Sequence, residues 1–427
     1  MNLARTIAAT LISLAVLQTG SGAAGGATEL AVTDRANAFA SIAASGNFAS
    51  IVWGATKGGL TDIYVAVSHD GGRGFGAPLL INRTAGPANV SGEQPPRVTL
   101  VPRAKQDPSI VVVWTAKTDA GTRLVSARSD DGGRSFAAAQ LVPGTDAPGN
   151  RGWESAATTR DGSVVAMWLD HRGLSGASMN HAEHQHAAAG GNKADGVARA
   201  QLSKLFFARL DGRDNGRALT GGVCYCCKTS VATDSDGSVY AAWRHVYDGN
   251  VRDIAFSRSS DGGRSFSTPV RVSEDKWVLD GCPENGPALA VDQQKRIHVA
   301  WPTLVPGESS SAEPTLGMFY AMSQNGEHFT PRQSLPTEGF PRHVQLAVTV
   351  KGEIVAVWDE QAPGVRRAVV ARGRVNSSGA TQFVRQPIED AAAATYPVVA
   401  AAEGGLIVAW TSGTSGQTVL RTRWLPQ

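Results

Sequence analysis

The sequence predicts an all-β protein, specifically a β-propeller of seven four-stranded blades. Two observations lead to this prediction. Short apolar runs that end in tryptophan recur along the chain, and turns rich in glycine separate them, with 48 glycines among 427 residues. Runs of four to six residues bounded by Gly, Asp and Pro are typical of strands, and no unit shows the periodicity of a helix.

The tryptophan-terminated run occurs seven times, at spacings of 61, 54, 75, 58, 57 and 52 residues. A repeat of about 57 residues with about four strands in each copy is typical of propeller blades. Six blades is the alternative, should one unit be miscounted. The runs are Ile51–Trp53, Val111–Trp114, Val164–Trp168, Val239–Trp243, Ile297–Trp301, Ile354–Trp358 and Leu406–Trp410.

The two ends of the chain each contain part of one blade. The last unit stops after its third strand, Val419–Trp424, and an isolated strand, Leu30–Thr33, precedes the first unit. Propellers commonly close by letting one terminus complete the blade that the other began, which hides open sheet edges. We therefore expect residues 28–427 to form a single domain in which these two strands pair.

Residues 1–24 are expected to be a signal peptide rather than part of the domain. Arg5 supplies a positive start, Ile7–Leu17 is apolar, and Ser21-Gly22-Ala23 offers small residues for cleavage. The apolar run is shorter than the roughly 20 residues that span a bilayer. The protein is therefore expected to be exported, to a periplasm or to the medium. Its 40 Lys and Arg against 37 Asp and Glu, without a basic run, do not indicate nucleic-acid binding.

A second repeat, Ser-x-Asp-x-Gly-x-x-Phe, lies between the expected third and fourth strands. Its aspartate is expected to accept backbone N–H groups within a turn, while glycine supplies a positive φ. A worn copy, Met322–Phe329, places Gln324 at the aspartate position. The good copies are Ser68–Phe75, Ser129–Phe136 and Ser259–Phe266, with aspartates Asp70, Asp131 and Asp261.

These copies, in register with the tryptophan repeat, resemble the Asp-box (BNR) proteins of the sialidase superfamily. The resemblance implies a propeller with its Asp-boxes on the rim opposite the substrate, where they stabilise turns. The box itself says little about function, because many propellers that hydrolyse nothing carry it.

In a propeller, the connection into the first strand of a blade and the loop after the second strand share one face. Arginine and histidine are enriched there, as at His171, His245 and His343, which favours a binding site on this face. An acidic glycan is the expected ligand.

Sialidases hold the sugar carboxylate with three arginines and use a tyrosine nucleophile activated by a glutamate. The resemblance places Tyr396 as the nucleophile, Glu154 as its partner, and Arg172, Arg244 and Arg342 as the arginines. The Phe/Tyr-Arg-Ile-Pro motif of that family is missing, and no aspartate stands out as acid/base. Each arginine could instead form a salt bridge on the rim.

The four cysteines occur in two groups, Cys224, Cys226 and Cys227 before the fourth blade and Cys282 before the fifth. In an oxidising compartment they predict disulfides, with three pairings open. A bridge between neighbours Cys226 and Cys227 would strain their peptide, so we expect a bridge from the first group to Cys282. A thiolate site for copper(I) or zinc is the alternative.

A long loop after Trp168 contains His181, His184 and His186 among Ala and Gly residues. Imidazole nitrogens at this spacing can wrap copper(II) or zinc, so these histidines are candidate metal ligands. Alternatively, the loop is an insert whose histidines are incidental.

Two functions therefore stay open. One is a glycan-binding propeller of sialidase type that can hydrolyse its ligand, and the other is a non-enzymatic propeller that binds a metal or a partner.

Overall fold

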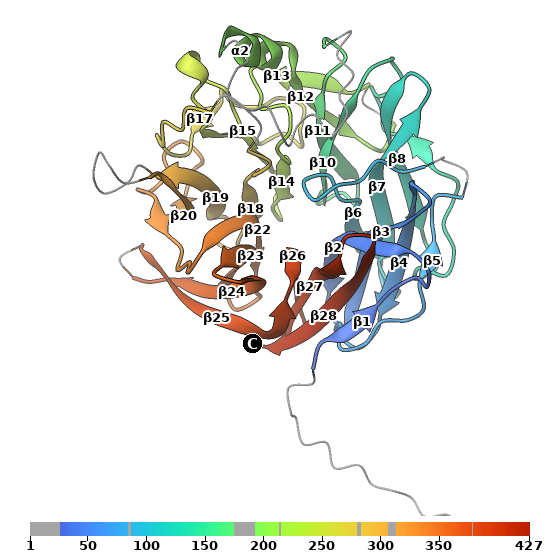
Figure 1. Cartoon of the computed structure of the whole chain (residues 1–427). Coiled ribbons are helices and arrows are strands. Elements are labelled where there is room, and N and C mark those ends of the chain that lie inside the picture. Colours follow the sequence, from blue (N-terminus) through green and yellow to red (C-terminus); the bar gives the residue numbers. More distant parts are fainter. Residues whose placement is uncertain are drawn as a thin grey trace, which may run out of the picture.

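The computed structural model describes residues 26–83, 87–174, 193–212, 215–279, 283–305, 313–377 and 379–427. It consists of seven four-stranded antiparallel sheets arranged around a central axis (Figure 1). The predicted seven-bladed propeller is thereby confirmed, and the six-bladed alternative is wrong. The expected signal peptide, residues 1–24, lies outside the described residues.

Each blade runs outward from the axis. The innermost strands are β2 (Ala36–Ser45), β6 (Arg97–Val101), β10 (Arg151–Thr158), β14 (Ser230–Thr233), β18 (Ala288–Val291), β22 (Phe340–Val348) and β26 (Ala394–Ala402). The second strands are β3 (Phe48–Lys57), β7 (Ser109–Thr118), β11 (Val164–Asp170), β15 (Val239–Arg244), β19 (Ile297–Val305), β23 (Ile354–Ala362) and β27 (Gly405–Thr414). The third strands are β4 (Leu60–Ser68), β8 (Gly121–Ser129), β12 (Lys204–Arg209), β16 (Ile254–Ser259), β20 (Thr315–Ser323), β24 (Val365–Val375) and β28 (Gln417–Pro426). The outer strands are β5 (Leu79–Leu80), β9 (Gln140–Leu141), β13 (Arg217–Thr220), β17 (Val270–Arg271), β21 (Gln333–Ser334), β25 (Thr381–Ala392) and β1 (Thr28–Leu30).

The tryptophan repeat fills the space between blades. All seven of these indoles are buried, and each packs against the blade that precedes its own around the ring. Trp114 of the second blade, for example, lies against Val52, Ile63 and Val65 of the first blade. A large apolar ring at a fixed place in every second strand therefore joins consecutive sheets, which is why the repeat predicts the fold.

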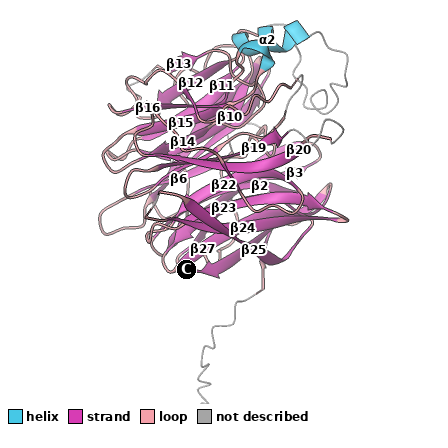
Figure 2. Cartoon of the chain, turned by 90° about the vertical axis from the view of Figure 1, so that its left-hand side faces the viewer, coloured by secondary structure: helices cyan, strands magenta, loops and turns pink. Residues whose placement is uncertain are grey.

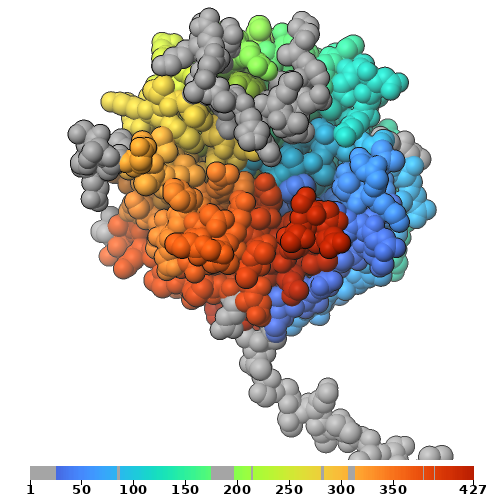
Figure 3. All heavy atoms as spheres, viewed as in Figure 1, coloured from blue at the N-terminus to red at the C-terminus, as the bar shows by residue number. Residues whose placement is uncertain are grey.

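The seventh blade closes the ring as expected. β1 adds to β28, with Thr28 opposite Thr422 and Leu30 opposite Leu420. The strand is Thr28–Leu30 rather than Leu30–Thr33, because the Asn37 side chain bonds both the N–H and the carbonyl of Val32 and draws the chain away from the sheet. Figure 3 shows the blue N-terminal blade beside the red C-terminal residues.

The Asp-boxes form hydrogen-bonded turns between the third and outer strands. In the second copy, Asp131 Oδ1 accepts N–H bonds from Arg134 and Ser135 at 3.0 Å. In the worn copy the aspartate position is filled by Asn325, not Gln324. Its Oδ1 accepts the N–H groups of Glu327 at 3.0 Å and His328 at 3.3 Å. That turn is one residue shorter than the others, which shifts the alignment.

The sequence did not predict two short helices. The ten-residue helix α2 (Lys193–Leu202) precedes β12, and Figure 2 shows it beside the outer part of that blade. A 3₁₀ turn, η1 (Asp248–Asn250), lies between β15 and β16. Within the part of the chain that the structure describes, no helix is long and apolar enough to cross a membrane.

Candidate functional site at the channel mouth

The innermost strands of four blades carry the same irregularity near their first residues. In β2, β10, β22 and β26 the register shifts by one residue, which is a β-bulge. Each bulge opens on a non-glycine residue with positive φ: Phe39 (60°), Trp153 (55°), His343 (55°) and Tyr396 (52°). Bulky residues rarely adopt this conformation, and backbone strain of this kind clusters at functional sites.

The bulges are held by the blade that precedes them around the ring. The backbone N–H of each bulge residue donates to a side-chain oxygen from that neighbour. The four pairs are Phe39 to Thr411 (3.1 Å), Trp153 to Gln94 (3.4 Å), His343 to Asn285 (3.5 Å) and Tyr396 to Asp359 (3.3 Å). The strained geometry is therefore fixed by contacts between blades, at the end where the chain enters the innermost strands. We call this end the channel mouth.

Three rings lie in a row at the channel mouth. The ring of Tyr396 makes an edge contact with Phe39 at 5.1 Å between centroids and lies 4.1 Å from the imidazole of His343. These residues come from the first, sixth and seventh blades. Phe39 and Tyr396 are partly exposed, so they offer apolar ring surface to a ligand.

The loop between β5 and β6 reaches across the channel mouth. A Cβ on Gly92 would lie 1.7 Å from the Tyr396 ring, so only glycine allows the loop to pass there. The next residue, Glu93, extends to the opposite blades. Its Oε2 accepts the backbone N–H groups of Lys228 at 2.9 Å and Gly286 at 2.7 Å.

Glu93 forms the centre of a small charged cluster. Its Oε1 is buried without a hydrogen bond to any described residue, and the Lys228 ammonium lies 3.9 Å away. The pKa of Lys228 is lowered to about 8, chiefly because it is buried. The pKa of nearby, partly exposed Glu284 is raised, first by burial and then by the charge of Glu93. The channel mouth therefore contains carboxyl groups in different environments.

His343 is oriented by an aspartate. Its Nδ1 lies 2.7 Å from Asp359 Oδ1, and the other oxygen of Asp359 accepts from Arg366 at 2.6 Å. Burial alone would raise the pKa of Asp359, but His343 and Arg366 outweigh burial and lower it. A carboxylate on Nδ1 fixes the imidazole orientation and leaves Nε2 for other partners.

Tyr396, the predicted nucleophile, is at the channel mouth. Burial, followed by the charge of Asp359, raises its pKa to about 12. Its predicted partner Glu154 is the second residue of the β10 bulge and is fully buried. There its Oε2 accepts a hydrogen bond from Thr115 at 3.0 Å. The pairing of Glu154 with Tyr396 stays a prediction.

The three predicted arginines have different surroundings. Arg172 pairs with Asp170 at 2.7 Å, within the third blade. Arg244 is buried, with its donors on the carbonyl oxygens of Asn285, Arg252 and Pro302. Arg342 is exposed, next to His343, and its charge acts on Glu284. Their convergence on a sugar carboxylate stays a prediction.

The metal and disulfide candidates are only partly described. Cys224 and Cys227 are buried free thiols, with sulfurs 3.6 Å apart. The hydrogen bond from Cys227, followed by the charge of Arg252, lowers the pKa of Cys224 to about 6. Cys282 lies outside the described residues, so the bridge to it stays a prediction. The three candidate metal ligands of the long loop, His181, His184 and His186, also lie outside them.

Glu93 and Phe39 were not singled out from the sequence, whereas Trp153 and Glu284 belong to segments that the sequence placed at the entry to their blades. One feature of the sequence could have identified most of the residues at the channel mouth. Phe39, Trp153, Lys228, His343 and Tyr396 each precede the buried tryptophan of their blade by 14 or 15 residues. Glu93 has no such signal, because it lies in the loop between β5 and β6 that crosses the channel mouth.

No family model and no curated protein matches this sequence. Several solved structures share the fold. The polysaccharide lyase Uly1 aligns with 12% identity and a TM-score of 0.54 over 96% of this chain and 94% of its own. A Penicillium chrysogenum alpha-L-arabinanase complexed with arabinobiose aligns with 10% identity and a TM-score of 0.51, over 94% and 98%. The GH93 alpha-L-arabinofuranosidase of Fusarium graminearum has the same identity and coverage and a TM-score of 0.50. At these identities the likeness shows the fold alone.

Proposed function

We propose that this protein is an exported propeller that binds a glycan at the channel mouth and cleaves it there. The observation that carries the proposal is the set of four strained bulges, which bring rings from four blades to one end of the channel around Glu93. Sugars offer apolar C–H faces that pack on aromatic rings, and hydroxyl groups that bond to carboxylates. A site with aromatic surface and a few placed polar groups suits such a ligand.

Glu284 is the candidate general acid. Its carboxyl group is partly exposed, and its raised pKa lets it hold a proton to a higher pH than an ordinary glutamate, which suits donation to a leaving oxygen. His343, held by Asp359, is positioned to exchange a proton through Nε2. The Tyr396 hydroxyl, with a pKa of about 12, enters as a hydrogen-bond donor to the sugar.

An acidic sugar is the ligand class that we favour. The exposed guanidinium of Arg342 lies beside His343, and guanidinium groups grip carboxylates with two parallel hydrogen bonds. The family resemblance carried by the Asp-boxes points to the same class, with a sialic acid as its best-known member. Neutral arabinan-type chains are the ligands with which acidic sugars are compared.

The proposal is tested with purified mature protein and a panel of polysaccharides and fluorogenic glycosides. The panel includes sialosides, uronic-acid polymers and arabinans. Released reducing ends report hydrolysis, and unsaturated uronic ends report elimination. We expect cleavage of an acidic member, and a loss of about 10²- to 10⁴-fold in kcat/KM for Glu284→Gln. The Tyr396→Phe variant should bind its ligand more weakly.

Asp131→Ala, at the opposite face, is the matched control and should keep full activity. Binding without turnover across the panel would leave a glycan-binding protein and remove the enzyme. No binding of any glycan by a folded protein would overturn the proposal. Export is tested separately, by sequencing the N-terminus of the protein recovered outside the cytoplasm and comparing it with the cleavage expected near residue 24.

A further inference from the structure

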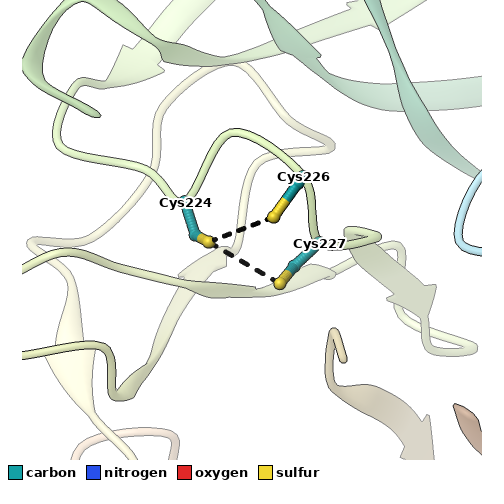
Figure 4. Close-up of side chains that lie close together, drawn as sticks. All are labelled: Cys224, Cys226 and Cys227. Atoms are coloured by element: carbon teal, nitrogen blue, oxygen red, sulfur yellow. Dashed lines mark hydrogen bonds between the residues drawn. The ribbon is translucent and has the colours of Figure 1, made fainter. Parts of the chain in front are cut away.

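Cysteine sulfurs gather beside the channel mouth, in the segment between β13 and β14 (Figure 4). Cys224 Sγ lies 3.6 Å from Cys227 Sγ and 3.8 Å from Cys226 Sγ. Cys224 and Cys227 are 1% and 2% exposed, and both are free thiols. This group is the only one with metal-ligand geometry among the residues that the structure describes.

Two buried guanidinium groups accompany the thiols. Arg252 Nη1 lies 3.1 Å from Cys224 Sγ, and Arg252 and Arg244 are 0% and 1% exposed. In the described part of the chain, their other hydrogen-bond acceptors are carbonyl and amide oxygens. Buried charges are normally compensated by an opposite charge. Among the described residues that Arg252 contacts by hydrogen bonds, Cys224 is the one that can become an anion, when its thiol loses a proton.

We propose that Cys224 and Cys227 form a bis-thiolate site for a soft monovalent cation of the copper(I) type. Metal–thiolate bonds are about 2.3 Å long, so one ion can contact two sulfurs 3.6 Å apart without backbone movement. Binding displaces the two thiol protons to solvent, because only the thiolate is a ligand. Arg252 acts as a positioning residue that compensates the charge of the Cys224 sulfur.

The surroundings favour copper(I) over zinc. Structural zinc sites use four ligands, and the described group contains no histidine or carboxylate. Soft thiolates suit copper(I). Two thiolates with a monovalent ion keep one negative charge, which the Arg252 guanidinium balances. The assignment leaves Cys226 for the bridge predicted to Cys282. It does not depend on glycan binding.

The test is an anaerobic titration of the full mature protein with copper(I), in competition with a chromophoric copper(I) chelator. We expect one tightly held copper per chain and sulfur ligands in the copper X-ray absorption spectrum. The Cys224→Ser/Cys227→Ser variant should lose this copper. Replacing Arg252 by Met should weaken binding about 10- to 100-fold, as loss of an outer partner of a metal ligand does, and Arg252→Lys should restore most of it.

Two variants serve as controls. Cys226→Ser/Cys282→Ser and His181→Ala/His184→Ala/His186→Ala should both keep the sulfur-bound copper. If Cys224→Ser/Cys227→Ser does not fold, the test uses the wild-type protein. Bound copper(I) should then protect two thiols from alkylation. The site would be disproved by copper that survives in Cys224→Ser/Cys227→Ser, by its loss from folded Cys226→Ser/Cys282→Ser, or by zinc binding with equal occupancy.

Discussion

The two ends of the propeller differ in how some of their carboxyl groups are partnered. At the Asp-box end, hydrogen bonds from Ser135 and its backbone lower the pKa of Asp131. At the channel mouth, burial raises the pKa of Glu154 to about 7 and also raises that of Glu284. The Asp131 oxygens are bonded within their own turn, whereas Glu93 and Glu154 each keep a buried oxygen that has no hydrogen bond within the described part of the chain.

This difference is consistent with a structural role for the Asp-box end and with the proposed site at the channel mouth. The Asp-box turns are stabilised by contacts a few residues apart. The channel mouth is held by contacts between blades, which fix the strained backbone of the four bulges. A surface cavity of about 510 Å³ does lie at the Asp-box end, beside Asp261 and Arg264. Among the described residues that line it, none is aromatic and none is a buried group without a hydrogen-bond partner, so its size alone does not favour it as the site.

The largest effect on stability is expected from a loss of packing in the core, which supports both ends. Trp114→Ala removes an indole packed between the first and second blades, and its Nε1 has no hydrogen-bond partner among the described residues. We expect the free energy of unfolding to fall by about 3–5 kcal/mol. Urea unfolding followed by tryptophan fluorescence measures it. Trp114→Phe keeps part of the packing and should lose less. Equal losses for the two variants would show that packing is not the cause.

Glu154 should make the channel mouth sensitive to pH. Its folded pKa of about 7 lies above the ordinary 4.5. Between these two pH values the native state therefore holds a proton that the unfolded chain has lost. The stability from this group is present below pH 4.5 and is lost as the pH rises through 7, by about 3 kcal/mol. Glu154→Gln should remove this loss. Parallel stability curves for the wild type and the variant from pH 5 to 9 would contradict the assignment.

The fold could be predicted because its determinant repeats in the sequence. Each blade needs an indole against its neighbour, so seven tryptophans predict seven blades. Tyr396 could be placed at the entry to the seventh blade for the same reason, and its role as nucleophile stays a prediction. The positive φ of Trp153 or His343 could not be predicted, because no local residue type requires it. Glu93 was missed because its partners, Lys228 and Gly286, are distant in the sequence.

Asp131 should matter for stability only. Replacing it by Ala removes the acceptor of the Arg134 and Ser135 N–H groups, at a cost of about 0.5–2 kcal/mol, as for the loss of a helix-capping oxygen. Thermal unfolding and glycan binding are measured together. Asp119→Ala, in an exposed turn of the same blade, should change neither. Weaker glycan binding by Asp131→Ala at an unchanged melting temperature would assign function to the Asp-box end.

The smallest effect is expected at the worn turn, where Asn325→Asp would restore the acidic residue. An ionised acceptor strengthens the bonds from the Glu327 and His328 N–H groups. The same change replaces the contact between Asn325 Nδ2 and Glu327 Oε2, at 3.4 Å, by repulsion between two carboxylates. We therefore expect Asn325→Asp alone to change stability by less than about 0.5 kcal/mol, as is usual for surface substitutions. Adding Glu327→Gln should reveal the gain as a higher melting temperature, while Glu327→Gln alone should show none. A double variant no more stable than the wild type would mean that the turn draws no stability from its acceptor charge, and that the contrast between the two ends rests on the channel mouth alone.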